Sequence, residues 1–277
     1  MPASDVRQCA VLGSPIEHSL SPVLHRAAYA ELGLRWRYSA VDIEGDELRR
    51  FLDGLDESWR GLSLTMPLKR TVLPLLDDLD EWATVSGAAN TVVINHGVRH
   101  GFNTDILGAV AALRERVRGP FTEAVVLGGG ATATSVLIAL GLLGCERARL
   151  LVRDPSRAAE TVAAVGRSAT GPALIVEALT DPVGAADLVV STIPAAAQTP
   201  ELVAGAESCP VVFEVLYDPW PTPLAAAALV SGRILVSGFD LLVNQAAIQV
   251  ELMTRQTPPI AAMRAAGEGA LAARSQR

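Results

Sequence analysis

The feature that most constrains the fold is an uncharged stretch, 124–145, with three consecutive glycines inside it. A membrane-spanning helix needs about 20 apolar residues, so this alternative has to be weighed first. Gly128, Gly129 and Gly130, however, follow a four-residue apolar run and precede an apolar helical segment, 133–143. That order predicts a strand, a tight turn and a helix, and it disfavours a membrane span.

Strand-like and helical stretches continue to alternate after this turn. The expected strands are 148–152, 173–177, 188–191, 211–215 and 234–236, with helices such as 155–165 and 222–229 between some of them. Such alternation predicts βαβ units and a mainly parallel, twisted sheet. The glycine turn would then open a dinucleotide site, because glycines let the backbone approach a pyrophosphate and a helix N-terminus supplies amide donors. Its spacing departs from GxGxxG, so a plain strand–helix turn is the alternative.

The first hundred residues predict a second set of strands and helices. The expected strands are 11–12, 36–41, 62–64, 91–94 and 98–102, and the expected helices are 21–33 and 105–117. A helix start with an N-cap at Ser21 and proline in the first turn begins the first helix. Asn95, His96 and Gly97 predict a hairpin turn. Two more helices, 241–254 and 260–273, are expected at the end of the chain.

Composition narrows the functional class. The chain has 277 residues, room for one large domain or two modest ones. Its net charge of −7 argues against a nucleic-acid or anionic-membrane partner. The three cysteines are widely spaced and form no CxxC pair, so we expect neither a disulfide framework nor a metal site. With no secretion signal visible at the start, a reducing, cytoplasmic location is expected.

One residue type is almost missing from the chain. Of its 23 basic residues, 22 are arginine and Lys69 is the one lysine. A guanidinium stays protonated, whereas an amine can exchange a proton. Lys69 is therefore a candidate acid–base residue, and chance survival of a stray lysine is the alternative.

Small polar side chains gather where strands and turns end. They are Ser19 and Ser21; Ser63, Thr65 and Lys69; Asn90 and Thr91; and Asn103, Thr104 and Asp105. Each group taken singly is explained by capping or turn chemistry. Together they can hold a ligand that carries several hydroxyl groups.

The end of the second strand after the glycine turn bears on cofactor choice. Arginine at this point accommodates a 2′-phosphate, whereas an acidic residue binds a 2′-hydroxyl. Arg153 and Arg157 favour the phosphate and hence NADP, and Asp154 acts in the opposite direction. We predict that Asp154 caps the helix that begins at Pro155, which removes most of its effect on the phosphate. Solvated surface arginines are the alternative.

The ordered motifs resemble the shikimate dehydrogenase family over nearly the whole chain. The matching segments are the Gly13–His25 region (G-S-P-I-E-H-S-L-S-P-V-L-H), Thr65-Met66-Pro67-Leu68-Lys69, Gly87-Ala88-Ala89-Asn90-Thr91, Asn103-Thr104-Asp105, Tyr217 with Thr222-Pro223, and Gln245-Ala246-Ala247. The resemblance implies two α/β domains: a substrate domain at 1–105, a Rossmann-like NADP-binding domain at 106–237, and C-terminal helices at 238–277 that return to the substrate domain.

The resemblance also implies an activity and a set of site residues. The reaction would be 3-dehydroshikimate with NADPH to shikimate with NADP, in aromatic amino acid biosynthesis, with Lys69 and Asp105 as the catalytic pair. Substrate would be bound by Ser19, Ser21, Ser63, Thr65, Lys69, Asn90, Asp105, Tyr217 and Gln245. The cofactor would be held by Gly128, Gly129, Gly130, Ala131, Arg153, Arg157, Thr192 and Gly238. No metal is expected, and the protein is expected to be a monomer or a homodimer.

Several positions depart from the family pattern. Ser63 stands where asparagine is usual, Ala131 replaces a second loop glycine, and Asp240 replaces a glycine near the nicotinamide. Three alternatives therefore stay open. One is the same fold acting on quinate or an aminoshikimate. Another is a non-catalytic NADP-binding sensor, which the retention of Lys69 and Asp105 disfavours. A third is a methylene-tetrahydrofolate dehydrogenase, which the serine pair Ser19 and Ser21 disfavours.

Overall fold

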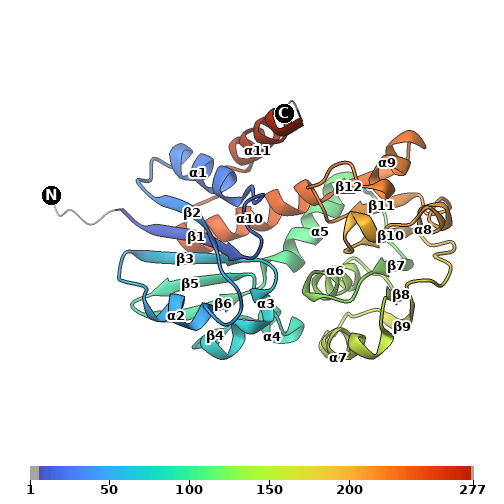
Figure 1. The fold of residues 1–277 in the computed structure, drawn as a ribbon, viewed down its shortest axis with the longest axis horizontal. Helices are drawn as coiled ribbons and strands as arrows, with labels where there is room; N and C mark the ends of the chain where they lie inside the picture. Colours follow the sequence, from blue (N-terminus) through green and yellow to red (C-terminus); the bar gives the residue numbers. More distant parts are fainter. Residues whose placement is uncertain (1–5, 276–277) are drawn as a thin grey trace. The chain divides into compact units, whose positions relative to one another are not determined.

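The computed structural model describes residues 6–275, apart from the side chains of Arg157 and Ser275. The chain divides into two compact units, shown as a ribbon in Figure 1. Unit 1 comprises the residues up to Thr104 together with those from Leu242 onward, and unit 2 comprises Asp105–Leu241. The divisions thus fall after Thr104 and after Leu241, where the sequence predicts them after residues 105 and 237.

Unit 1 is built on a mixed six-stranded sheet with the order β2-β1-β3-β5-β6-β4. Its strands are β1 (Gln8–Gly13), β2 (Arg37–Asp42), β3 (Trp59–Leu64), β4 (Asp78–Leu79), β5 (Thr91–Asn95) and β6 (Val98–Phe102). Its helices are α1 (Ser21–Glu31), α2 (Leu48–Asp53), α3 (Leu68–Thr71), η1 (Leu73–Leu75), α4 (Glu81–Ser86), most of α10 (Gly238–Thr254) and α11 (Ile260–Ser275). The first three strands in chain order are parallel, β5 runs antiparallel to both of its neighbours, β3 and β6, and β4 pairs with β6 in parallel.

Both faces of this sheet are covered. Leu62, Leu64 and Val92 belong to a buried cluster that includes residues of α2 and α3. Gly61 faces Met253 of α10, and a Cβ at Gly61 would lie 2.6 Å from the Met253 side chain. The β5–β6 hairpin turns through His96 and Gly97, both with positive φ, as the sequence predicts.

Unit 2 is built on six parallel strands with the order β12-β11-β10-β7-β8-β9. These strands are β7 (Glu123–Leu127), β8 (Arg147–Val152), β9 (Ala173–Ala178), β10 (Leu188–Ser191), β11 (Val211–Glu214) and β12 (Ile234–Ser237). The helices are α5 (Thr104–Arg116), α6 (Ala131–Leu142), η2 (Pro155–Ala158), α7 (Ala159–Arg167), η3 (Ala195–Ala197), α8 (Pro200–Gly205) and α9 (Pro223–Val230). The strand order reverses between β7 and β10, which makes the carboxyl ends of these two strands the expected ligand-binding point of an open α/β sheet.

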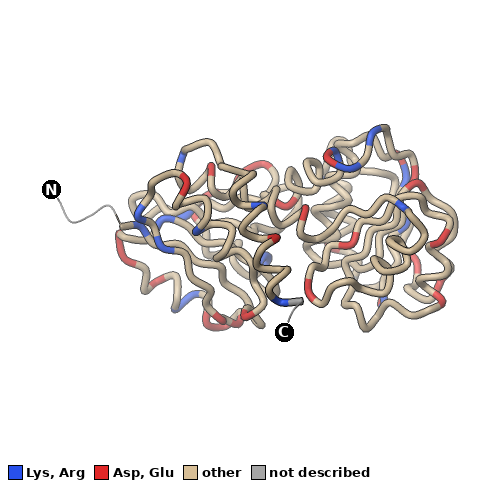
Figure 2. Tube along the Cα trace, turned by 90° about the horizontal axis from the view of Figure 1, so that it is seen from above, with Lys and Arg blue, Asp and Glu red and all other residues tan. Residues whose placement is uncertain are grey.

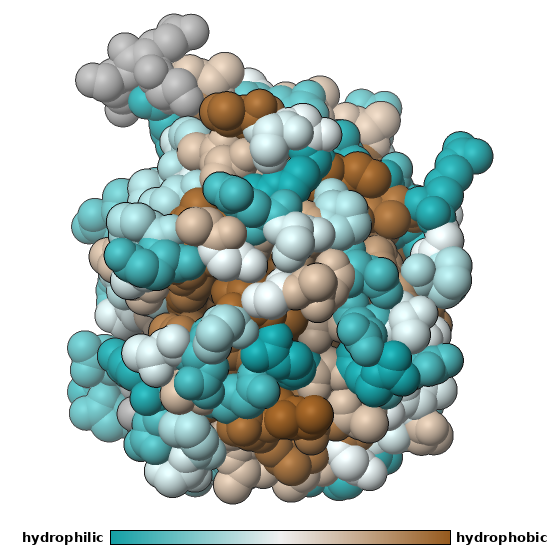
Figure 3. Space-filling view, turned by 90° about the vertical axis from the view of Figure 1, so that its right-hand side faces the viewer, coloured by the Kyte–Doolittle hydropathy of each residue, from teal (hydrophilic) through white to brown (hydrophobic). Residues whose placement is uncertain are grey.

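Surface properties agree with an acidic globular chain. Figure 2 shows acidic and basic positions along the trace of both units. Exposed apolar side chains form separate groups on the face in Figure 3.

Cys9, Cys145 and Cys209 are buried and free of disulfides. None of the helices formed by the described residues is long and apolar enough to cross a membrane.

Candidate active site

The loop between β1 and α1 carries the two predicted serines. Ser21 is buried and is the first residue of α1, and its N–H donates to the hydroxyl of Ser19 over 3.3 Å. The N-cap of α1 is Leu20, with no side-chain cap, so the predicted capping role of Ser21 is wrong. The sequence pattern misled because a serine before proline is the usual cap, whereas here the helix begins one residue earlier. From α11, Arg274 donates to the backbone oxygen of His18 over 3.0 Å and so holds the loop.

Thr65 and Lys69 follow the end of β3. The N–H of Thr65 donates to Leu12 O over 2.9 Å, which ties this turn to the end of β1. A Cβ at Gly13 would overlap the Thr65 side chain, so glycine is needed for the close approach. Lys69 is partly buried in α3, and its backbone oxygen accepts from Ala89 N over 2.8 Å. The lysine is thereby joined to the segment that leads into Asn90.

Gln249 of α10 is the hub of a buried polar network that the sequence did not indicate. Its Oε1 accepts from the Ser63 hydroxyl over 2.7 Å and lies 3.2 Å from His25 Nε2. Its Nε2 donates to the Thr91 hydroxyl over 3.0 Å. Tyr38 in turn donates to Ser63 over 2.6 Å. The single proton of Ser63 therefore goes to Gln249, and toward substrate this hydroxyl can only accept.

Asn90 connects this network to Thr104 and Gln245. Its Oδ1 accepts from Thr104 N over 2.8 Å and from the Thr91 hydroxyl over 2.9 Å. Its Nδ2 donates to the Thr104 hydroxyl over 2.9 Å and to Gln245 Oε1 over 3.3 Å. Three segments far apart in sequence thus meet through buried amides and hydroxyls. Asp105, also buried, is the residue directly after Thr104.

His25 is the buried aromatic support of the hub. Its ring stacks on Tyr38 with centroids 4.0 Å apart. Burial lowers the pKa of His25 to about 3, and the hydrogen bond with Gln249 acts in the other direction. The ring is therefore neutral near pH 7. Because Gln249 offers its oxygen, we assign the proton to Nε2, which leaves Nδ1 as an acceptor 3.5 Å from the Tyr29 hydroxyl.

In unit 2, Gly128 lies at the reversal point of the sheet. It directly follows β7, has φ +99°, and donates its N–H to Leu151 O over 2.8 Å. A Cβ here would lie 2.5 Å from the Thr192 hydroxyl. Thr192 directly follows β10, and both its N–H and its hydroxyl donate to Leu127 O, over 2.9 and 2.8 Å. A tight turn is thereby built from the ends of the two strands.

Gly129 and Gly130 complete the turn into α6. A Cβ at Gly129 would lie 3.0 Å from a methyl group of Val152, whereas one at Gly130 would meet nothing within 4 Å. Gly130 is the N-cap of α6 and Ala131 is its first residue. The turn therefore presents backbone amides at a helix N-terminus, as binding of a phosphate requires.

The residues predicted to choose between NADP and NAD follow β8. Arg153 and Asp154 are exposed. Asp154 Oδ1 accepts from Ser156 N over 3.1 Å and from its hydroxyl over 2.6 Å, so the predicted cap is confirmed, at a 3₁₀ turn before α7. The side chain of Arg157 lies outside the described part of the structure.

The segment with Tyr217 is held by a buried carboxylate. Glu214 accepts from Gln198 Nε2 and the Thr222 hydroxyl, both over 2.7 Å, and from Leu216 N over 3.1 Å. Burial raises the pKa of Glu214, while the hydrogen bonds lower it. Tyr217 itself is partly buried. This network fixes both ends of the loop between β11 and α9.

Asp240 helps to cap the start of α10. Its Oδ2 accepts from the N–H and hydroxyl of Ser237 over 3.0 and 2.8 Å, and its N–H donates back to that hydroxyl over 3.1 Å. This is a capping box, and Asp240 also pairs with Arg116 at 3.0 Å. The spacing S-x-x-D was a signal for it. Gly238, next in the chain after Ser237, cannot be replaced easily because a Cβ would overlap the backbone of Val215.

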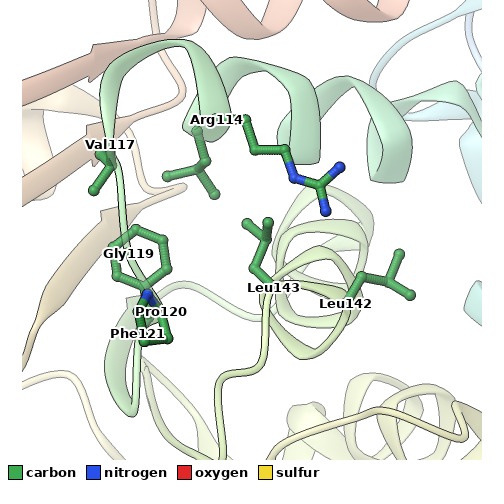
Figure 4. Close-up of a pocket in the computed structure, with 8 residues that line it drawn as sticks. Arg114, Val117, Gly119, Pro120, Phe121, Leu142 and Leu143 are labelled. Atoms are coloured by element: carbon green, nitrogen blue, oxygen red, sulfur yellow. The ribbon is translucent and has the colours of Figure 1, made fainter.

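A surface cavity in unit 2 lies at the opposite end of α6 from the glycine turn. It has a volume of about 310 Å³ and is lined by Arg114, Val117 and the ends of α5 and α6 (Figure 4). The glycine turn is at the other end of α6, about 18 Å away for a helix of this length. The cavity is therefore not part of the cofactor turn.

Two family models match the chain. The shikimate dehydrogenase substrate binding domain matches residues 11–92, and the shikimate 5′-dehydrogenase C-terminal domain matches residues 238–266. A protein of Moorella thermoacetica named shikimate dehydrogenase (NADP(+)) is 36% identical over 266 residues, which cover 92% of this chain and 90% of that protein.

Solved structures are similar over almost the whole chain. The shikimate dehydrogenase of Mycobacterium tuberculosis is 37% identical with a TM-score of 0.85, covering 95% of this chain and 99% of that one. A quinate dehydrogenase of Corynebacterium glutamicum, solved in complex with NAD, is 27% identical with a TM-score of 0.82, covering 96% and 99%. Both have the architecture found here.

Proposed function

The chain belongs to the shikimate dehydrogenase family, and from this premise we propose that it is an NADP-dependent shikimate 3-dehydrogenase. It interconverts 3-dehydroshikimate with NADPH and shikimate with NADP, a step of aromatic amino acid biosynthesis. The observation that carries the proposal is the convergence of Asn90, Thr104 and Gln245 on one buried network directly before Asp105. A set of amides and hydroxyls of this kind suits a ligand with several hydroxyl groups.

The turn at Gly128 fits a dinucleotide. Glycine keeps open a space that a Cβ would fill against Thr192, and the first amides of α6 are positioned for phosphate oxygens. Arg153 is exposed where a 2′-phosphate would be bound, and Asp154 is engaged in its cap. We assign Gly128, Gly129, Gly130, Ala131, Arg153, Arg157, Thr192 and Gly238 to the cofactor.

Oxidation of a secondary alcohol removes a hydride and a proton. When bound, NADP accepts the hydride. We assign the hydroxyl proton to the Lys69 amine, with Asp105 orienting the amine and the hydroxyl. Ser19, Ser21, Thr65, Asn90, Tyr217 and Gln245 bind the other hydroxyls and the carboxylate. Ser63 can contact the substrate only as a hydrogen-bond acceptor, because it donates its proton to Gln249.

Quinate is the second candidate substrate. The short Ser63 side chain, where the family usually has asparagine, and the similarity to a quinate dehydrogenase favour it. We nevertheless prefer shikimate, because quinate has an extra hydroxyl on a saturated ring and would need a further hydrogen-bond partner. As for assembly and location, we propose a monomer or homodimer in the cytoplasm.

The test is an absorbance assay at 340 nm with shikimate and quinate, each with NADP and with NAD. We expect reduction of NADP with shikimate and very little with quinate. Equal kcat/KM for the two acids would support the quinate alternative. Binding of NADP without turnover of either acid would support a non-catalytic sensor.

A further inference from the structure

The carbonyl groups of the glycine turn are held by two buried threonines. The Thr161 hydroxyl, from α7, donates to Gly129 O over 2.9 Å. From the first turn of α6, the N–H of Thr134 donates to Gly130 O over 3.0 Å, and its hydroxyl lies 3.2 Å from the same oxygen. Neither threonine has any accessible surface. Two helices thus fix the orientation of two successive peptide groups.

Because the peptide group is planar, the contacts of the two carbonyl oxygens also fix the directions of the neighbouring N–H groups. In a trans peptide the C=O of one residue and the N–H of the next point in opposite directions. Holding Gly129 O against α7 therefore aims the Gly130 N–H away from α7. Likewise, holding Gly130 O against Thr134 aims the Ala131 N–H out of the helix. These amides are among those that a helix start leaves without intrahelical partners.

The two hydroxyls also form a chain. Thr134 Oγ1 and Thr161 Oγ1 are 2.9 Å apart. A hydroxyl has one proton. Since Thr161 gives its proton to Gly129 O, the bond between the two hydroxyls has Thr134 as donor. The chain therefore runs from α6 through α7 to the turn, and each bond polarises the next.

We propose that Thr161 is a positioning residue for the pyrophosphate of the dinucleotide, and this inference rests on the proposed function. Thr161 does not touch the cofactor. It fixes the peptide between Gly129 and Gly130 so that its N–H is presented to a phosphate oxygen. Without the hydroxyl, this glycine peptide is free to rotate, and the ordering of the turn has to come from the binding energy of the cofactor.

The test compares Thr161→Val with Thr161→Ser in the full-length protein. Valine keeps the shape and removes the donor, and serine keeps the donor. We expect Thr161→Val to raise the Kd for NADP about five- to tenfold, and Thr161→Ser to stay within about twofold of wild type. The Kd for adenosine 2′-monophosphate, which has no pyrophosphate, is expected to be unchanged in both, and so is the KM for shikimate at saturating NADP.

Thr199→Val is the matched control. Thr199 caps α8 in the same unit and does not contact the turn. We expect it to lower the melting temperature without changing the Kd for NADP. If Thr161→Val lowers the melting temperature but leaves that Kd unchanged, Thr161 only supports packing and the inference is wrong. Equal weakening of adenosine 2′-monophosphate, or no rescue by serine, overturns it as well.

Two further results need their own interpretation: a Thr161→Val variant that does not fold, and a wild-type protein that does not bind NADP. If Thr161→Val does not fold, Thr134→Val decides, because it removes the hydroxyl that donates to Thr161; a two- to fourfold rise in the Kd for NADP is expected, and no rise overturns the inference. If the wild-type protein does not bind NADP, the proposed function fails, and that result is distinct from an unaffected Thr161 variant.

Discussion

The two units build their polar sites from different materials. Unit 1 uses side chains: Gln249, Asn90 and Gln245 join strands and helices through buried amides. At its glycine turn, unit 2 uses backbone instead: Gly128 and Gly129 bring main-chain groups close together, and side chains such as Thr161 only orient them. A ligand with many hydroxyls needs a particular set of donors and acceptors, whereas a pyrophosphate needs several amides in one place. We therefore expect substitutions in the unit 1 network to leave buried polar groups unpaired, and substitutions in the glycine turn to introduce steric strain.

The largest effect is expected at Lys69. If its amine takes the proton, Lys69→Ala lowers kcat by at least about 10²-fold with little change in KM. Lys69→Arg should restore little, because a guanidinium does not give up its proton. Steady-state kinetics with shikimate and NADP measure both. A variant with normal kcat and a raised KM would make Lys69 a binding residue only.

The next effect tests the side-chain network of unit 1. Gln249→Leu leaves Ser63, His25 and Thr91 without their amide partner in a buried site. Each unpaired buried group costs about 1–3 kcal/mol, so the free energy of unfolding should fall by more than about 2 kcal/mol. Denaturant unfolding measures it. Gln256→Leu, at an exposed position two residues after α10, should stay within about 0.5 kcal/mol. Equal stability of the two variants would contradict the role of the network.

The glycine turn offers the corresponding test in unit 2. Gly128→Ala forces a side chain to φ +99° and against Thr192, a strain of about 1–3 kcal/mol. We expect lower stability and weaker NADP binding. Gly166→Ala is the control, because Gly166 is exposed inside α7 and its Cβ would meet nothing within 4 Å. If both alanines weaken NADP binding equally, the space at Gly128 is not what the cofactor requires.

The smallest effect concerns pH. Burial lowers the pKa of His25 to about 3, against 6.5 for an exposed histidine. Below pH 6.5 the His25 ring is protonated in the unfolded chain, whereas in the folded protein it stays neutral down to about pH 3. The free energy of unfolding therefore falls as the pH is lowered from 6.5 to 3. The loss is about 1.4 kcal/mol for each pH unit. Between pH 6 and 5, wild type should lose this much more than His25→Phe in denaturant unfolding.

Two carboxylic acids with raised pKa values do not affect that comparison. Burial raises the pKa of Asp80 and of Glu214, which acts in the opposite direction, but both groups are present in the two proteins and cancel in the difference. The quantity compared between wild type and His25→Phe is the slope of the unfolding free energy against pH. The same slope in His25→Phe would mean that the His25 ring takes up its proton in the folded state.

The sequence by itself determined the features that depend on neighbouring residues. Alternating strands and helices, the glycine turn at Gly128, the hairpin at Gly97 and the cap at Asp154 are all local, because φ preference, periodicity and capping act over a few positions. The single lysine and the ordered motifs pointed to the family for the same reason: they are read along the chain. The capping box of Ser237 and Asp240 was readable too, from its spacing alone.

Tertiary structure decided what joins distant segments. His25 and Gln249 are 224 positions apart, and no spacing rule relates them. That Ser63 gives its proton to Gln249, that Glu214 holds the Tyr217 loop, and that α1 begins at Ser21 with Leu20 before it, all depend on which groups become buried together. A buried polar group must find a partner wherever the fold supplies one. The partner is therefore a property of the packed molecule, even though each group is already present in the sequence.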